Sequence, residues 1–147
     1  VIKKDDKEYI LFLITKSPPI FCENKAQFCL EMPAGLVGDI NENEDILAAI
    51  KRELKEESGY EAQEIKIVSR KISSSAGLTS ETSTVAIAYI DGNVEYDKPT
   101  DNDGGVIIEK KLVEKNKVLN FIQDFEKQGN AIGAQTLCGL FFAFFGN

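Results

Sequence analysis

The chain has 147 residues, of which 43% are hydrophobic and 28% are charged, enough for one domain with a substantial core. Its formal net charge of −7 argues against a nucleic-acid-binding surface, because phosphate backbones require an excess of lysine and arginine. It has no histidine, which excludes Ser-His-Asp triads, Cys-His pairs and zinc held by histidine. We therefore expect a single domain over residues 1–147 that works with carboxylates, lysine, tyrosine, hydroxyl groups or a metal ion.

The cysteines and the ends of the sequence bear on the cellular compartment of the protein. Cys22, Cys29 and Cys138 are odd in number and lack C-x-x-C spacing, so we expect free thiols in a cytoplasmic protein. The sequence has no signal peptide and no apolar run of about 18 residues, which argues against a membrane protein. It begins at Val1 rather than at a methionine, which leaves room for upstream residues.

The first third of the chain has the composition of β-strands. Residues 7–16 are apolar and rich in β formers, which predicts a strand that ends at residues 17–19, Ser-Pro-Pro. Alternating apolar residues predict a short hairpin or a pair of strands over residues 20–32. Gly35 and Gly38 then allow the chain to bend sharply.

One helix is predicted over residues 44–57. Asn43 is the expected N-cap, and Gly59 is suited to the left-handed residue that ends the helix. Acidic residues in the first turn and basic residues toward the end agree with the helix dipole.

One stripe of this helix changes character along its length. Ile46 and Ile50 begin it, Glu53 and Glu57 continue it, and Glu56 flanks its end. Crowded carboxylates beside a core repel one another and are costly to desolvate. A hard cation such as Mg²⁺ or Mn²⁺ would relieve both costs. The alternative is a solvated helix end whose glutamates point outward.

The second half predicts three strands, over residues 62–73, 82–91 and 106–113, with a polar loop at 97–105. Helical spacing of apolar residues predicts two helices, at the end of the chain, over residues 114–127 and 132–145.

The last predicted helix has a large apolar face. We interpret this face as core or as the contact of a homodimer rather than as a ligand site, because helical stripes are usually packing surfaces. Its members are Leu137, Leu140, Phe141 and Phe144. The order of strands and helices fits the α/β class, as an α/β/α sandwich with a mixed β-sheet.

The residues around the first helix also follow a known pattern. The spacing G-x5-E-x7-R-E-U-x-E-E-x-G-U, where U is bulky and apolar, is matched by Gly38, Glu44, Arg52, Glu53, Leu54, Glu56, Glu57, Gly59 and Tyr60. With each fixed type at roughly 5–7% usage, a chance match is about one in a hundred million per starting point. This pattern is the Nudix box, so the chain resembles the Nudix hydrolases, whose fold is the same α/β/α sandwich, and its box helix is the one predicted over residues 44–57.

The resemblance implies hydrolysis of a nucleoside diphosphate linked to another group, with Mg²⁺ as the metal and Mn²⁺ able to substitute. The implied metal ligands are Glu53, Glu56 and Glu57. In many relatives a backbone carbonyl also reaches a metal, which makes Ala34 a backbone ligand here. Arg52 is expected to pair with a box carboxylate, or else to form a surface salt bridge. Glu44 is expected to complete that network, or else to favour the helix N-terminus by charge alone.

Flanking segments resemble the ADP-ribose and ADP-sugar pyrophosphatases of this family. Residues 29–37 resemble their E-x-P-A-G segment, residues 17–19 their R-P-P segment, and residues 75–81 their S-P-G-x-x-x-E loop. The resemblance covers roughly residues 8–113. It implies hydrolysis of ADP-ribose to AMP and ribose 5-phosphate, or of a similar nucleotide sugar, as a small-molecule substrate.

Three positions depart from that subfamily. Ser17 replaces the arginine, Ala76 replaces the loop proline, and Gly105 stands where many members have a glutamate that positions the water. The candidates to replace it as the base are a box glutamate, Asp101, Asp103 and Glu109. The alternatives are hydrolysis of damaged nucleoside triphosphates or dinucleoside polyphosphates, and a non-catalytic module that binds a nucleotide.

Overall fold

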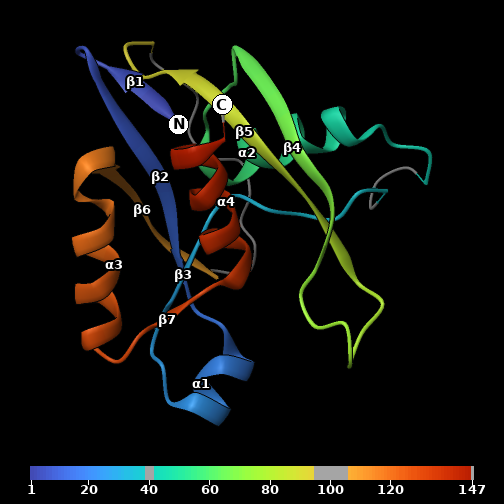
Figure 1. The fold of residues 1–147 in the computed structure, drawn as a ribbon, viewed down its shortest axis with the longest axis vertical. Helices are drawn as coiled ribbons and strands as arrows, with labels where there is room; N and C mark the ends of the chain where they lie inside the picture. Colours follow the sequence, from blue (N-terminus) through green and yellow to red (C-terminus); the bar gives the residue numbers. More distant parts are fainter. Residues whose placement is uncertain (39–41, 95–105, 147) are drawn as a thin grey trace.

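A computed structural model describes residues 1–38, 42–94 and 106–146 of the chain (Figure 1). The elements in chain order are β1 (Ile2–Lys4), β2 (Lys7–Thr15), α1 (Pro18–Asn24), β3 (Cys29–Glu31), α2 (Ile46–Ser58), β4 (Glu64–Ser73), β5 (Thr82–Asp91), β6 (Ile107–Glu114), the 3-10 turn η1 (Lys115–Lys117), α3 (Val118–Lys127), β7 (Ala131–Ile132) and α4 (Ala134–Phe145).

Strand β2 organises the seven-stranded sheet. Strand β6 runs antiparallel along one edge of β2, from Tyr9 to Thr15. The other edge of β2 pairs first with β1 and then with β3, both antiparallel. The sheet extends outward from there, because β1 also pairs with β5 and β3 also pairs with β7, both in parallel. The sheet is therefore mixed, as the sequence predicts.

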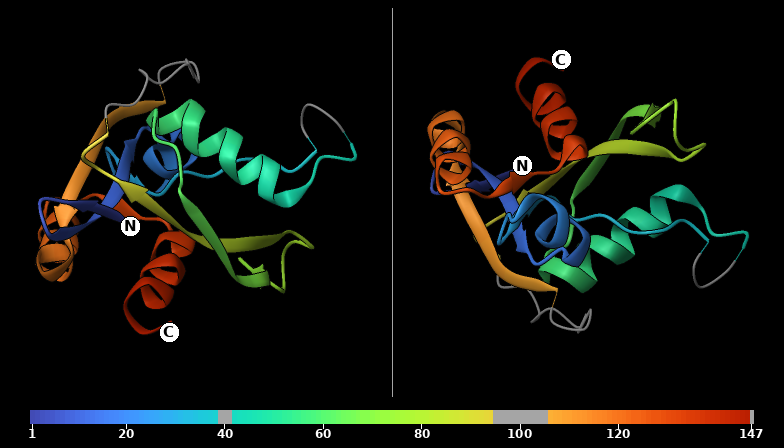
Figure 2. Two further views of the ribbon diagram at one scale, coloured as in Figure 1. Left: turned by 90° about the horizontal axis from the view of Figure 1, so that it is seen from above. Right: turned by 90° about the horizontal axis from the view of Figure 1, so that it is seen from below.

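Both faces of β2 are buried, because its apolar residues do not alternate with polar ones. Ile10 and Phe12 join a core cluster with residues of α3 and α4. Leu11 points the other way and packs with Leu54 of α2. Figure 2 shows α2 on one side of the sheet and α4 on the other. The structure thus confirms an α/β/α sandwich. The predicted box helix, α2, covers one face of the sheet, and α3 and α4 cover the other.

The prediction of strands throughout residues 20–32 is wrong in its first part. Residues 18–24 form helix α1 instead, and only Cys29–Glu31 is a strand. Ser17 is the extended N-cap residue, and two prolines follow in the first turn, where a missing N–H costs nothing. The prolines that end one strand therefore also begin a helix.

The three strands and the two C-terminal helices that the sequence predicts are confirmed within a few residues as β4, β5, β6, α3 and α4. Strands β1 and β7 were not predicted. Each has three residues or fewer and joins the sheet by pairing with a strand that is distant in sequence. The predicted polar loop at residues 97–105 lies outside the described residues.

Helix α4 buries less of its apolar face than a core helix would. Leu140 is buried, but Leu137, Phe141 and Phe144 are 50%, 58% and 41% exposed. The interpretation of this face as core is thus wrong for three of its four members. Whether the face is a homodimer contact stays a prediction.

All three cysteines are free, as expected: Cys22 is exposed, Cys29 is buried and Cys138 lies between these extremes. In the described part of the chain, no helix is long and apolar enough to cross a membrane.

Candidate functional site

The candidate site starts with the ends of helix α2. Asp45, rather than the expected Asn43, is the N-cap, and its carboxylate accepts the N–H groups of Leu47 and Ala48 at 3.0 and 3.3 Å. At the other end Gly59 is left-handed, with φ 79°, and its N–H donates to a carbonyl one turn back. The N-cap prediction is wrong because two side chains of similar capping ability lie two positions apart, and the sequence does not rank them.

The buried face of α2 is rotated slightly from the predicted stripe. Ala49, Leu54 and Ser58 are buried, whereas Ile46 and Ile50 are only partly so. The glutamates of the C-terminal half thus lie beside the core rather than in it. The side chains of Glu53 and Glu56 are 16% and 35% exposed, so neither points freely into water. The solvated-end alternative does not describe them.

Arg52 is the centre of the hydrogen-bond network. Its Nε and Nη2 donate to Oε1 and Oε2 of Glu44 at 3.0 and 3.2 Å. Its Nη1 donates to Glu53 at 2.7 Å and to Glu56 at 3.1 Å. Nη2 also donates to the carbonyl of Leu36, in the loop before the helix, at 3.3 Å. One guanidinium thus orients three carboxylates and ties the loop to the helix.

The same contacts set the electrostatics. The hydrogen bond from Arg52, with a second from the backbone N–H of Gly38 at 3.1 Å, holds the pKa of Glu44 below its usual value. In turn Glu44, and then Glu53 and Glu56, raise the pKa of Arg52. Gly38 has φ 86°, a conformation that favours glycine, so this motif glycine allows its N–H to face Glu44.

Two glutamates of the motif also contact the Pro-Ala-Gly loop, residues 33–35, which precedes the helix. Oε2 of Glu57 accepts the N–H of Ala34 at 2.9 Å. The carboxylate of Glu53 occupies the space that a Cβ on Gly35 would fill. The sequence assigns Gly35 to a bend, but its φ is not positive; the structure requires a glycine there for close approach. The loop and the helix therefore meet through carboxylates.

The donor chemistry of this region fits a hard divalent cation. Glu53, Glu56 and Glu57 offer carboxylate oxygens from one end of one helix, and Ala34 brings backbone polar groups beside them. Among the residues that the structure describes, however, no group of three or more acidic, cysteine or histidine side chains is arranged to hold a metal ion. In this arrangement Arg52 binds Glu53 and Glu56, and the Ala34 N–H binds Glu57, so the carboxylates are directed to those donors.

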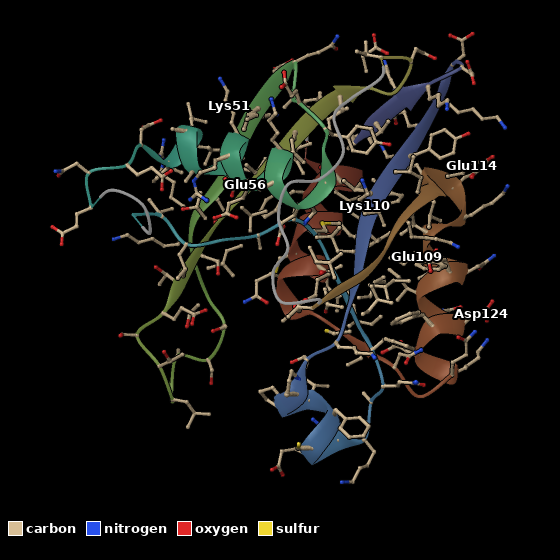
Figure 3. The ribbon with its side chains drawn as sticks, turned by 180° about the vertical axis from the view of Figure 1, so that it is seen from behind. Lys51, Glu56, Glu109, Lys110, Glu114 and Asp124 are labelled. Carbon is tan, nitrogen blue, oxygen red and sulfur yellow. The ribbon has the colours of Figure 1, made fainter. Side chains whose placement is uncertain are left out.

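The candidate bases outside the box do not lie beside the box glutamates in the described part of the structure. Glu109 is on β6, paired with Lys111 at 3.1 Å. Successive side chains of a strand alternate between faces, and the next residue, Lys110, contacts α2, so Glu109 faces away from α2 (Figure 3). Asp101, Asp103 and Gly105 lie outside the described residues.

Lys110 is a contact that sequence reasoning missed. Its Nζ donates to the carbonyl of Ser58, the last residue of α2, at 2.5 Å. The pattern of β6 carries only a weak signal for it, because four charged residues occur among its eight.

Comparison with known proteins agrees with this geometry. The NUDIX domain family matches residues 1–128. The putative nudix hydrolase 2 of Caenorhabditis elegans is 29% identical over 138 residues, covering 92% of this chain and 58% of that protein. The ADP-ribose pyrophosphatase of Saccharomyces cerevisiae is 34% identical over 111 residues, covering 73% of this chain and 46% of that protein. The chain therefore spans about half the length of these relatives.

A solved structure described as an ADP compounds hydrolase superposes with a TM-score of 0.66 at 19% identity, covering 98% of this chain and 68% of the other. At that identity the likeness shows the fold, and it agrees with the observed α/β/α sandwich. The family match includes strands β1 to β6 and helices α2 and α3. This chain belongs to the Nudix family.

Proposed function

We propose that this chain is a Mg²⁺-dependent pyrophosphohydrolase that cleaves the diphosphate of ADP-ribose or a related nucleotide sugar. The products are a nucleoside monophosphate and a sugar phosphate. The observation that carries the proposal is the convergence of the box on the Pro-Ala-Gly loop, where Glu57 meets Ala34 and Glu53 lies against Gly35. A surface helix has no need to bring carboxylates onto a loop in this way.

The roles of the residues are assigned from their positions in the motif. Glu53, Glu56 and Glu57 hold Mg²⁺, or Mn²⁺ in its place, and the carbonyl of Ala34 supplies a further oxygen. When bound, the metal neutralises phosphate oxygens and acidifies the attacking water. The proton of that water passes to a carboxylate, either a box glutamate or an acidic residue of the loop before β6.

Arg52 and Glu44 act on the other box residues. Arg52 keeps the carboxylates of Glu53 and Glu56 in fixed rotamers, since its planar guanidinium presents donors in a rigid geometry. Glu44 holds the guanidinium from the opposite side through two hydrogen bonds. Such partners raise the precision of a metal site rather than contacting the substrate.

The substrate class rests on two observations. One is the segment Glu31-Met32-Pro33-Ala34-Gly35, which has the E-x-P-A-G pattern of the ADP-ribose branch. The other is the similarity to a yeast protein named for ADP-ribose hydrolysis. A small phosphorylated ligand agrees with the net charge of −7 once a metal contributes positive charge, whereas nucleic acid does not. The cytoplasmic location stays a prediction.

The test is a substrate panel. Purified protein with Mg²⁺, and then with Mn²⁺, is mixed with ADP-ribose, ADP-glucose, NADH, a dinucleoside tetraphosphate and 8-oxo-dGTP, and the released mononucleotide is measured. AMP from ADP-ribose or ADP-glucose, lost in Glu57→Gln, supports the proposal. The matched control is Glu126→Gln, an exposed glutamate of α3 on the far side of the sheet, which should keep full activity.

Two other results discriminate the alternatives. Release only from the triphosphate or the dinucleotide would move the chain to another substrate class with the same metal chemistry. Tight nucleotide binding without turnover of any substrate would identify a binding module, for which the departures at Ser17, Ala76 and Gly105 give a reason.

A further inference from the structure

Lys110 lies on the face of the sheet that carries the box helix. In the register of the sheet, Leu13 of β2 stands between Lys110 of β6 and Glu31 of β3. Side chains at such register positions share one face. Val113, three positions further along β6, belongs to the opposite face and packs with α3 and α4. Lys110 is therefore directed toward α2, whereas its neighbours on the strand are not.

Among the described residues, the polar contacts of the Lys110 side chain lie at the end of α2 and just beyond it. Its Nζ donates to the carbonyl of Ser58 at 2.5 Å and lies 5.8 Å from the centre of the Tyr60 ring. Figure 3 shows Lys110 on β6 beside the helix. A cation at this point is favourable, because the C-terminal carbonyls of a helix lack partners within the helix and carry negative dipole charge.

The last turn of α2 also contains local hydrogen bonds. The hydroxyl of Ser58 donates to the carbonyl of Leu54 and accepts the N–H of Tyr60 at 3.1 Å, and the Gly59 N–H donates to Lys55 at 2.8 Å. These hydrogen bonds shape the turn but do not fix it on the sheet. Lys110 supplies a side-chain hydrogen bond from β6 to this turn, across 52 positions of sequence, in addition to the packing of Leu54 against Leu11 of β2.

The charge of Lys110 is not explained by an ion pair. None of the ion pairs among the described residues includes it, whereas its neighbour Lys111 pairs with Glu109 at 3.1 Å. The Lys110 residue is exposed overall, while partial desolvation of its ammonium group lowers its pKa. The feature that sets Lys110 apart from its neighbours on β6 is thus the contact of its Nζ with the end of α2.

We propose that Lys110 is a positioning residue, which anchors the last turn of α2 to the sheet and thereby sets the place of the Glu57 carboxylate for metal binding. The proposal rests on the proposed function, since it concerns the metal site of that reaction. Ser58 directly follows Glu57, whose carboxylate meets the Ala34 N–H at 2.9 Å. A shift of the last turn would move Glu57 first and Glu53, one turn back, less.

The size of the effect follows from this geometry. A misplacement of about 1 Å in a catalytic constellation can cost on the order of 100-fold in rate. Lys110 acts through the backbone of one turn whose local hydrogen bonds remain, so a smaller loss of about tenfold is expected. Because Lys110 does not touch the substrate, the loss should appear in metal affinity and kcat, and the KM for the substrate should stay within about twofold.

The experiment compares Lys110→Met, Lys110→Arg and the control Lys111→Met with the unaltered chain. Binding of Mn²⁺ to each purified protein is titrated by electron paramagnetic resonance without substrate, and kcat and KM are then measured with ADP-ribose. We expect Lys110→Met to bind Mn²⁺ about tenfold more weakly, Lys110→Arg to recover most of the affinity, and Lys111→Met to behave like the unaltered chain. Should Lys110→Met fail to fold, Lys110→Gln, which removes the charge and keeps an N–H donor, tests the same point.

The outcomes separate the two proposals. If the unaltered chain binds no Mn²⁺ and hydrolyses nothing, the proposed function is overturned, and this inference with it. If the unaltered chain binds Mn²⁺ and Lys110→Met binds it equally well with unchanged kcat, only the role of Lys110 is overturned. Equal losses in Lys110→Met and Lys111→Met would also overturn it, because general destabilisation of β6 would then explain the effect.

Discussion

The guanidinium of Arg52 binds the carboxylate of Glu44 through two hydrogen bonds, of 3.0 Å from Nε and 3.2 Å from Nη2. This bidentate pair joins Glu44, two positions before the first residue of α2, to the middle of the helix. It leaves Nη1 free to hold Glu53 and Glu56, so the geometry of the proposed metal ligands depends on a contact to a residue outside the helix.

The first prediction concerns the pH dependence of this pair. The pKa of Glu44 is lowered from 4.5 in the folded chain, mainly by Arg52. A carboxylate with a depressed folded pKa contributes stability that is present above its unfolded value and is lost as the pH falls through the folded value. Glu44→Gln should thus lower the melting temperature at pH 7, and this difference should shrink progressively below pH 4.5.

Thermal melts in the presence of a chelator measure this difference without a contribution from bound metal. The exposed Glu126→Gln serves as the control and should follow the unaltered chain at every pH. A difference between Glu44→Gln and the unaltered chain that stays constant down to pH 3 would contradict the assignment of the depressed pKa to this contact.

The second prediction concerns Gly35. A methyl group at this position would fall within the carboxylate of Glu53, so Gly35→Ala must displace either the loop or the glutamate. Since the φ of Gly35 is not positive, alanine itself is not strained there, and the chain should still fold. We expect Mn²⁺ affinity to fall by about 10- to 100-fold, in line with the loss of a positioned ligand.

The matched control for that variant is Gly77→Ala in the loop between β4 and β5. Its new methyl group would meet nothing within 4 Å, so its Mn²⁺ affinity and melting temperature should stay where they are. Unchanged Mn²⁺ affinity in Gly35→Ala would show that Glu53 is not a ligand from the position seen here.

What the sequence predicts well is local. The box helix was predicted because caps, charges and motif spacing all lie within about two dozen consecutive residues, and α2 forms where they indicate. The error at its N-cap, Asn43 for Asp45, is a choice between two similar side chains. The error at α1 has the same origin, because the prolines after Ser17 suit both the end of a strand and the first turn of a helix.

What the sequence does not predict depends on distant partners. Strand β7 exists because Ala131 pairs with Cys29. In the same way, all three residues of β1 pair with β2 and two of them also pair with β5. Lys110 is one of several charged residues on β6 until the fold places it against Ser58. The sequence predicts only that Gly35 lets the chain bend, yet its importance lies in the space that it leaves for Glu53. These facts require the tertiary structure.

The third prediction separates the two kinds of leucine on α4. Leu140 is 7% exposed and packs in the core cluster with α3, whereas Leu137, on the same helix, is 50% exposed. Leu140→Ala should lower the free energy of unfolding by about 2–4 kcal/mol, because it removes a buried side chain and leaves a cavity. Leu137→Ala should cost under about 1 kcal/mol.

Urea unfolding monitored by circular dichroism measures both variants. The measurement is made at low and at high protein concentration, because a homodimer through the exposed face of α4 would make the cost of Leu137→Ala depend on concentration. Equal costs for the two variants in dilute solution would contradict the burial described for α4.

The fourth prediction concerns the three thiols. Cys29 is 1% exposed, and burial raises its pKa to about 11, whereas Cys22 lies exposed on α1. Only the thiolate reacts, so a rise of the pKa from 9.0 to about 11 lowers the thiolate fraction of Cys29 about 100-fold, and burial adds a barrier to access. In iodoacetamide labelling at pH 8, followed by peptide mapping, Cys22 should be modified first and Cys29 only after urea is added.

In urea all three thiols should react at similar rates, which serves as the control for reagent quality. Labelling of Cys29 in the folded chain at the rate of Cys22 would mean that β3 opens readily, and with it the start of the Pro-Ala-Gly segment on which the candidate metal site depends.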